Sequence, residues 1–77
     1  MVRAYILIET APGKEGEVMS SVPHGLMNCL ALVHGFMPGE VLVHLHCEKL
    51  DYLNTAIMDI AKKNGVKNII TLLVKIE

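Results

Sequence analysis

Hydrophobic positions recur along the chain with two different periods, and the change from one period to the other predicts six elements. Segments rich in β-branched and aromatic residues predict strands, and apolar residues three or four positions apart predict helices. We predict strands over 3–9, 28–34, 40–47 and 66–76, and helices over 14–22 and 50–64. The order β-α-β-β-α-β is typical of ferredoxin-like α+β folds, in which two helices cover one face of a four-stranded antiparallel sheet.

Turn-forming residues mark the ends of these elements. Ala11-Pro12-Gly13 closes the first strand, and residues 35–39 form a hairpin turn between the two middle strands. Pro23 should end the first helix early, because proline has no amide hydrogen and disfavours helical geometry in the residue before it. Asn64-Gly65 supplies the left-handed residue at which helices commonly end.

The second helix has the most regular pattern in the chain. Asp51 is expected in its first turn and Lys62 and Lys63 in its last turn, as the helix dipole favours. One apolar stripe at helical spacing consists of Leu50, Leu53, Ala56, Ile57, Ile60 and Ala61. We expect this stripe to pack on the sheet.

Alternation along the two middle strands sorts their side chains onto two faces. The face that we expect to form the core carries Cys29, Ala31, Val33, Val43, Leu45 and Cys47. The opposite face carries Leu30, Leu32, His34, Leu42, His44 and His46. The first strand is hydrophobic on both faces (Tyr5 and Leu7 against Ala4, Ile6 and Ile8), and so is the last (Ile70, Leu72 and Val74 against Ile69 and Leu73). Since two helices cover only one face, we expect the other to mediate self-association.

The composition agrees with one small domain, residues 1–77, with more apolar material than it can bury alone. Of its 77 residues 52% are hydrophobic and 19% are charged, with a formal net charge of -1. A domain of this size buries only about 60% of the surface that its unfolded chain exposes. Disorder is excluded by this composition, and the absence of a basic stripe argues against direct nucleic-acid binding. We expect neither a membrane span nor a secretory signal.

Cys29 and Cys47 are the two cysteines of the chain. They are too few and too far apart in sequence to indicate a disulfide framework or a Cys-x-x-Cys redox motif. We interpret them as small buried hydrophobic residues rather than nucleophiles, and we expect a reducing, cytoplasmic location.

Histidines are the most suggestive polar side chains. His44 and His46 point the same way from one strand, and His34 is expected on the same face across the hairpin. Three imidazoles could bind zinc, but no second ligand pair follows at a characteristic spacing. We favour a position of these histidines at a subunit interface, and we predict no metal and no cofactor. The carboxylates form no pair suited to acid–base catalysis, so we predict no catalytic residue and no enzyme activity.

Five short motifs keep a recognisable order and spacing over nearly the whole chain. They are Val2-Arg3-Ala4-Tyr5-Ile6-Leu7-Ile8, Pro12-Gly13-Lys14, the turn that begins at Gly35, Asp51-Tyr52-Leu53-Asn54, and Gly65-Val66-Lys67-Asn68 leading to Thr71. In these motifs the chain resembles the effector-binding (RAM) domain of the Lrp/AsnC transcriptional regulators. The resemblance implies a dimer of α+β barrel type formed through the sheets, further assembly into rings of dimers, and amino-acid binding at the junctions between dimers.

The same resemblance implies a stand-alone regulatory module. Family members normally carry a helix-turn-helix DNA-binding domain in front, whereas Met1 here directly precedes the first strand. Stand-alone members are thought to sense amino acids or to modulate full-length relatives by forming mixed assemblies. The alternative is a chain from which a DNA-binding half has been removed.

The resemblance also implies an effector site. The matching positions are Gly35 in the hairpin turn and Thr71 on the last strand. The family turn usually reads Gly-x-Tyr-Asp, with the acid holding the effector's amine, and Glu40 is the acid that could take this role here. Two alternatives remain open: a small dimeric α+β barrel enzyme, cofactor-free monooxygenase-like or isomerase-like, and an oligomerisation module without a ligand.

Overall fold

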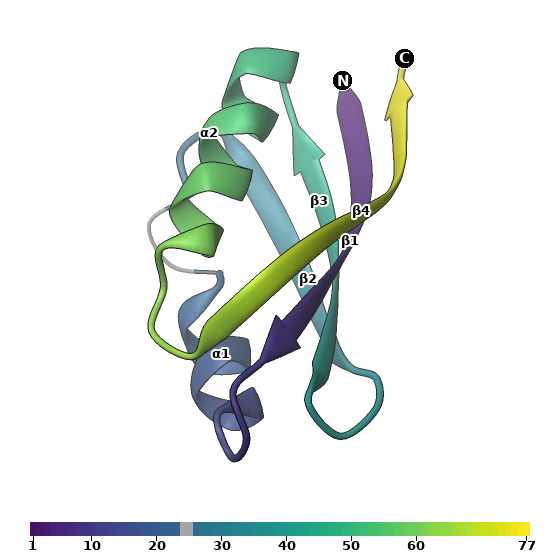
Figure 1. Ribbon diagram of the computed structural model, residues 1–77. Coiled ribbons are helices and arrows are strands. Elements are labelled where there is room, and N and C mark those ends of the chain that lie inside the picture. Colours follow the sequence, from purple (N-terminus) through teal and green to yellow (C-terminus); the bar gives the residue numbers. More distant parts are fainter. Residues whose placement is uncertain (24–25) are drawn as a thin grey trace.

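The computed structural model describes residues 1–23 and 26–77 and contains the six expected elements in the expected order (Figure 1). They are β1 (Val2–Thr10), α1 (Glu15–Ser21), β2 (Cys29–Gly35), β3 (Glu40–Cys47), α2 (Leu50–Ala61) and β4 (Val66–Ile76). The prediction of a ferredoxin-like α+β fold is confirmed. None of the helices in the described part of the chain has the length and apolar character needed to cross a membrane.

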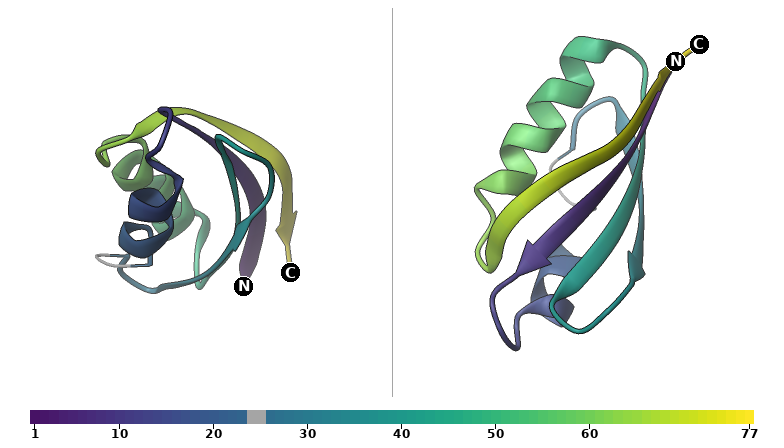
Figure 2. Two further views of the ribbon diagram at one scale, coloured as in Figure 1. Left: turned by 90° about the horizontal axis from the view of Figure 1, so that it is seen from below. Right: turned by 45° about the vertical axis from the view of Figure 1, so that its right-hand side comes forward.

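The four strands form one antiparallel sheet in the order β2-β3-β1-β4. Both helices lie on the same side of this strongly twisted sheet, which curves around them (Figure 2). The two ends of the chain lie side by side, because the Glu77 amide donates a hydrogen bond to the Met1 carbonyl at 2.9 Å. One face of the sheet is thus covered by helices, and the other is left open.

The hydrophobic core fills the space between the helices and the sheet. Its fully buried members alternate along the two central strands, as the pattern predicted, and include Ile6, Ile8, Val43 and Leu45. Leu53, Ala56 and Ile60 of α2 and Val18 of α1 close the core from the helix side, and Cys29, Ala31 and Val33 pack against it. Among the described residues Thr10 is the only buried polar side chain. This interior is therefore almost entirely apolar.

Helix α1 is short, as Pro23 predicted. It ends at Ser21, and Val22 donates the last helical hydrogen bond to the Val18 carbonyl. The acidic residues Glu15 and Glu17 lie in its first turn, where the positive end of the helix dipole favours them. The two residues that follow Pro23, His24 and Gly25, lie outside the described residues.

Helix α2 ends three residues earlier than the predicted boundary at residue 64. The amides of Lys62 and Lys63 turn back to the carbonyls of Asp59 and Ile60, which closes the helix with a tighter turn. The two lysines therefore follow the last turn instead of lying in it. Gly65 then takes a left-handed conformation (φ 92°), as the Asn64-Gly65 pair predicted.

The apolar stripe of α2 is narrower than predicted. Leu53, Ala56 and Ile60 are buried and Ile57 is partly buried, but Leu50 is 44% exposed and Ala61 is also exposed. Both exceptions are end residues of the helix.

Strand β4 departs from strict alternation. Its register against β1 shifts after Tyr5, which lies opposite Leu73, whereas the next residue, Ile6, lies opposite Thr71. Leu72 is the extra residue at this irregularity, as in a β-bulge.

The bulge changes which β4 side chains share a face. Directly opposed residues of antiparallel strands point to the same side of a sheet. Leu73 therefore lies on the open side with Tyr5, and Ile70 lies there with its partner Leu7. The prediction that Ile70, Leu72 and Val74 share one face is wrong, because alternation cannot be counted across an extra residue.

Cys29 and Cys47 form a disulfide. Their separation of 18 positions argued against pairing when only the sequence was considered, but the hairpin places them directly opposite each other on β2 and β3, with their Cα atoms 4.2 Å apart. The interpretation as two unlinked hydrophobic residues is corrected accordingly. Their predicted position on the core face is confirmed, and Cys47 is only 1% exposed.

Candidate functional site

The side of the sheet opposite the helices, here called the open face, carries large apolar side chains at the surface. Leu30 is 75% exposed, Leu32 and Leu73 are 55% exposed, and Ile70 is 40% exposed. Register and alternation assign to this face Tyr5, Leu7, Leu30, Leu32, His34, Leu42, His44, His46, Ile70 and Leu73. All four strands contribute, so the apolar area runs from one sheet edge to the other. Such a surface is typical of an interaction site.

A column of three rings in contact stands on the two inner strands of the open face. Tyr5 of β1 lies opposite His44 of β3, and their rings stack with centroids 4.2 Å apart and planes 13° apart. His46, two positions along β3, contacts His44 with the ring centroids 4.2 Å apart and the planes tilted by 52°. These residues come from the two inner strands, so the column stands at the middle of the sheet.

His44 is the least solvated of the three rings. Its Nε2 atom is buried and has no hydrogen-bond partner among the described residues. Burial lowers the pKa of His44 below its ordinary value, and the positive charges of His46, Arg3 and His34 lower it further. The imidazole is therefore held in its neutral form.

His34 lies beside this column on the outer strand β2. It is opposite Leu42 in the register, and it is exposed. The three histidines share the open face, as the alternation predicted. Within residues 1–23 and 26–77, however, no three His, Cys, Asp or Glu side chains are arranged to hold a metal ion.

Charged and polar side chains border the apolar area at both ends of the strands. At one end Arg3 pairs with Glu77 (Nε to Oε1, 3.0 Å) and lies opposite Lys75. At the other end the Asn68 amide donates to Glu9 at 3.0 Å, and Glu9 lies opposite Glu40. An apolar centre within a polar rim is the usual anatomy of a protein interface.

The three residues predicted to bind an effector do not meet within one chain. Gly35 is the last residue of β2 and Glu40 the first of β3, so both lie at the hairpin turn. Thr71 lies on β4, opposite Ile6, and is exposed. Because β2 and β4 are the two opposite edges of the sheet, Gly35 and Thr71 are separated by two strands.

A surface hollow of about 360 Å³ lies beside the hairpin turn, and the sequence analysis missed it. Its lining consists of Thr10, Pro12, Gly13, Glu15, Pro38, Gly39 and Lys67. Hydrogen bonds from the amide of Glu15 itself, and from those of Gly39 and Gly13, lower the pKa of the Glu15 carboxyl. The Thr10 hydroxyl also donates to this carboxylate, at 3.5 Å. The glycines signalled the turns, but nothing in the sequence indicated that two turns would meet.

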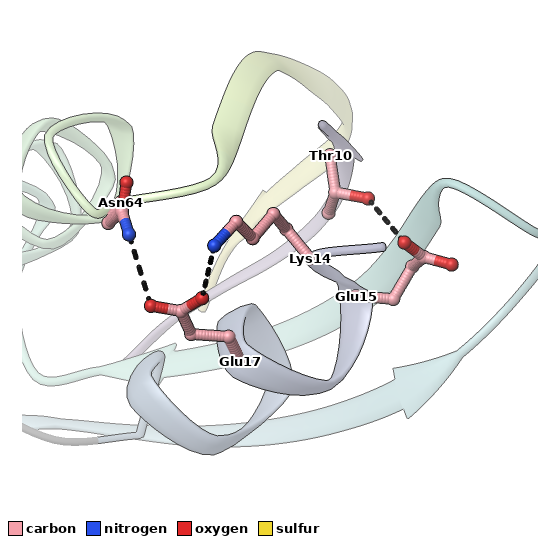
Figure 3. A network of polar contacts seen from close by, with 5 residues as sticks. All are labelled: Thr10, Lys14, Glu15, Glu17 and Asn64. Carbon is pink, nitrogen blue, oxygen red and sulfur yellow. Dashed lines mark hydrogen bonds and ion pairs between the residues drawn. The ribbon is translucent and has the colours of Figure 1, made fainter. Parts of the chain in front are cut away.

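A small polar network joins the start of α1 to the loop after α2 (Figure 3). The Glu17 carboxylate accepts a hydrogen bond from Asn64 at 3.1 Å and forms an ion pair with Lys14 at 3.2 Å. These two partners, Lys14 first, lower the pKa of Glu17. The network ties two connections that are 47 positions apart in sequence, and so it fixes one end of the helix layer.

Comparison with known proteins supports the fold class. No family model and no curated protein sequence matches the chain. A solved structure of the hypothetical protein PHS023 from Pyrococcus horikoshii superposes with a TM-score of 0.76 at 29% identity, over 100% of this chain and 92% of that one. The Tat proofreading chaperone NapD from E. coli gives 0.75 at 13% identity, over 97% and 78%.

A third solved structure has the same fold at a lower sequence identity. A protein assigned as an antibiotic biosynthesis monooxygenase from Chloroflexus aurantiacus J-10-fl gives a TM-score of 0.64 at 8% identity, over 100% of this chain and 95% of that one. The last two similarities concern the fold alone. Together with the element order and sheet topology, they define the chain as a small ferredoxin-like α+β domain.

Proposed function

We propose that this chain is a module of Lrp/AsnC type, which pairs with a second copy through the open face and binds a small effector, such as an amino acid, where subunits meet. In this role it acts on transcription through assembly with itself or with full-length regulators, and it does not contact DNA. The single observation that carries the proposal is the open face: an apolar surface across all four strands with a polar rim.

The size of the open face suits a second copy. The four strands contain 9, 7, 8 and 11 residues. With a rise of about 3.3 Å per residue and about 4.8 Å between strands, they cover about 550 Å² in projection. Stable interfaces bury at least about 600 Å² per partner, which side chains standing on such a sheet supply when the whole face is covered. A smaller partner would leave part of the apolar area in water.

The position of the central ring column also favours a symmetric pair. In a two-fold interface the same patch is used on both copies, so residues at its centre approach their own counterparts. Tyr5, His44 and His46 lie on the inner strands, where such an axis would pass.

Effector binding is proposed for the junctions between subunits. Glu40, the first residue of the inner strand β3, offers a carboxylate for an amine, and Thr71 on the edge strand β4 offers a hydroxyl. Strand β1 lies between these two strands within one chain, so we propose that a site using both groups is built from two chains. A ligand that binds such a junction shifts the population toward the assembled state.

The apolar interior supports a non-enzymatic role over the alternative of a barrel enzyme. Such an enzyme needs polar groups facing a cavity between helices and sheet, and the described residues place only Thr10 there. His34, His44 and His46 lie on the opposite face.

Two matched substitutions test the interface. Leu32→Lys places a charge on the open face, whereas Met58→Lys places one on the outer side of α2; the wild-type side chains are 55% and 60% exposed. Light scattering should find Leu32→Lys dissociated and Met58→Lys assembled like the wild type. Equal behaviour of the two variants contradicts the proposed interface.

Calorimetry with a panel of amino acids tests the effector. Binding of at least one of them, weakened by Glu40→Gln, is the expected result. No heat from any amino acid, with an intact assembly, would leave a ligand-free oligomerisation module in place of the sensor.

A further inference from the structure

We infer that the histidine column gives the open face a proton-sensitive lock: His44 and His46 must be neutral for two copies to pair, and their protonation separates the copies. This inference rests on the proposed pairing through the open face and adds its regulation.

The first step is the position of the two rings. His44 projects from β3 between Leu32 of β2 and Tyr5 of β1, and His46 projects from the same side between Leu30 of β2 and Arg3 of β1. Leu32 and Leu30, their direct neighbours on β2, are among the most exposed apolar side chains of the protein. A copy that covers these leucines must also cover both imidazoles. Covering removes the water that would solvate an imidazolium, so the charged form is penalised in the pair.

The second step is the charge that surrounds the rings. Arg3 of β1 lies opposite His46, and His34 stands on the neighbouring strand β2. Lys75 of β4 lies opposite Arg3. Glu9 and Glu40 lie at the opposite end of the strands, whereas Glu77 is paired with Arg3, and Glu48 lines the same surface hollow as His46. The positive charges of His46, Arg3 and His34 act against protonation of His44 within one copy.

The third step is symmetry. Each column would approach the same column of the second copy near a two-fold axis, so protonation would bring at least four positive rings together. Neutral rings can share a proton between two nitrogens as donor and acceptor, and two imidazolium rings cannot, because both offer only donors.

The direction of the pH effect follows from linkage. The paired state excludes protonated imidazoles and so binds fewer protons than the separated state, which means that pairing strengthens as pH rises and weakens as pH falls. Two copies contribute two such rings each, and the loss of pairing in acid grows with every imidazole that must stay neutral. The pKa of His44 is already lowered in the single copy, so His44 contributes less to this loss than an unperturbed imidazole would.

Sedimentation of the full chain at about pH 8 and about pH 5.5 tests the inference, with circular dichroism to verify that the chain stays folded. The wild type should pair at the higher pH and lose pairing at the lower pH. The double variant His44→Phe, His46→Phe keeps ring area and stacking on Tyr5 but cannot take a proton, and it should pair equally well at both values. Lys62→Gln, exposed at the end of α2, is the control and should behave like the wild type.

The possible failures are distinguishable. A wild-type protein that is monomeric at both pH values overturns the proposed pairing, and the lock with it. A wild type that is paired equally at both values overturns the lock and leaves the pairing intact. A double variant that still dissociates at low pH assigns the effect to other groups and also overturns the lock.

Discussion

Cys29 and Cys47 lie directly opposite each other on β2 and β3 and are joined by a disulfide. The bond ties the outer strand β2, which carries the most exposed leucine of the open face, to the centre of the sheet. It also closes a loop of 18 positions that contains the whole hairpin. The open face thus depends on a covalent link that lies on the opposite, core-facing side of the same two strands.

Reduction of this disulfide should destabilise the fold. A cross-link that closes a loop of this length contributes about 3 kcal/mol in the chain-entropy description. For a domain of this size that corresponds to a fall in Tm of more than about 10 °C. Thermal unfolding with and without a dithiol reductant measures the effect, and Cys29→Ser, Cys47→Ser should reproduce the reduced value without reductant. An unchanged Tm on reduction would contradict a stabilising role of the bond.

Gly65 should tolerate no side chain. Its φ of 92° is unfavourable for other residues, and a Cβ atom would lie 2.9 Å from the Lys14 Cβ and 3.3 Å from a Val18 methyl. Gly65→Ala should lower the free energy of unfolding by about 1–3 kcal/mol through backbone strain. Gly16→Ala is the matched control: that glycine lies in α1 with nothing within 4 Å of its Cβ position. Gly16→Ala should raise the free energy of unfolding by about 0.5–1 kcal/mol, as expected for alanine in a helix. A denaturant titration in which Gly16→Ala is less stable than Gly65→Ala would contradict this prediction.

The Glu17 network should contribute to stability only when the carboxylate is charged. Lys14 and Asn64 lower the pKa of Glu17, so its folded form binds a proton less readily than its unfolded form. The contribution is therefore fully present above the ordinary pKa of about 4.5 and is lost as pH falls through the lower, folded pKa. Glu17→Gln should be less stable than the wild type near neutrality and equal to it in strong acid.

A comparison with Glu48→Gln controls for the loss of one charge. Glu48 is exposed and lies outside the network. If both variants lose the same stability across the pH range, the contacts of Glu17 with Lys14 and Asn64 contribute nothing specific.

The sequence predicted the element order and the faces of the inner strands because these depend on local alternation. Residues such as Val43 and His44 follow strict period two within an uninterrupted strand, so their sides could be assigned without the fold. The residue at which α2 ends and the face of the sheet on which Leu72 lies could not be assigned from the sequence. The first depends on how Lys62 and Lys63 close the helix, and the second on a register shift against β1.

The candidate site was predicted in part for the same reason. That His34, His44 and His46 share a face follows from hairpin pairing and alternation. The stacking of Tyr5 on His44 required the register between β1 and β3, which are separated by 30 or more positions, and that register is not encoded in either strand alone. The disulfide and the hollow that includes Glu15 and Lys67 likewise arise from segments that meet only in the folded chain.

Removal of apolar area from the edge of the open face should weaken assembly gradually. Leu30→Ala removes a side chain that is 75% exposed, so folding stability should change by less than about 0.5 kcal/mol. The assembled state should lose about 1–2 kcal/mol for each buried leucine side chain, which raises the dissociation constant about tenfold or more. Sedimentation equilibrium measures the constant. A stability loss as large as the assembly loss would show that Leu30 acts within one chain.

The mass of the wild-type protein in solution tests the central claim most directly. Native mass spectrometry or light scattering near neutral pH should find multiples of the 8.5 kDa chain, beginning with the dimer and without the single chain as the main species. A particle of 8.5 kDa that persists at micromolar concentration would contradict pairing through the open face.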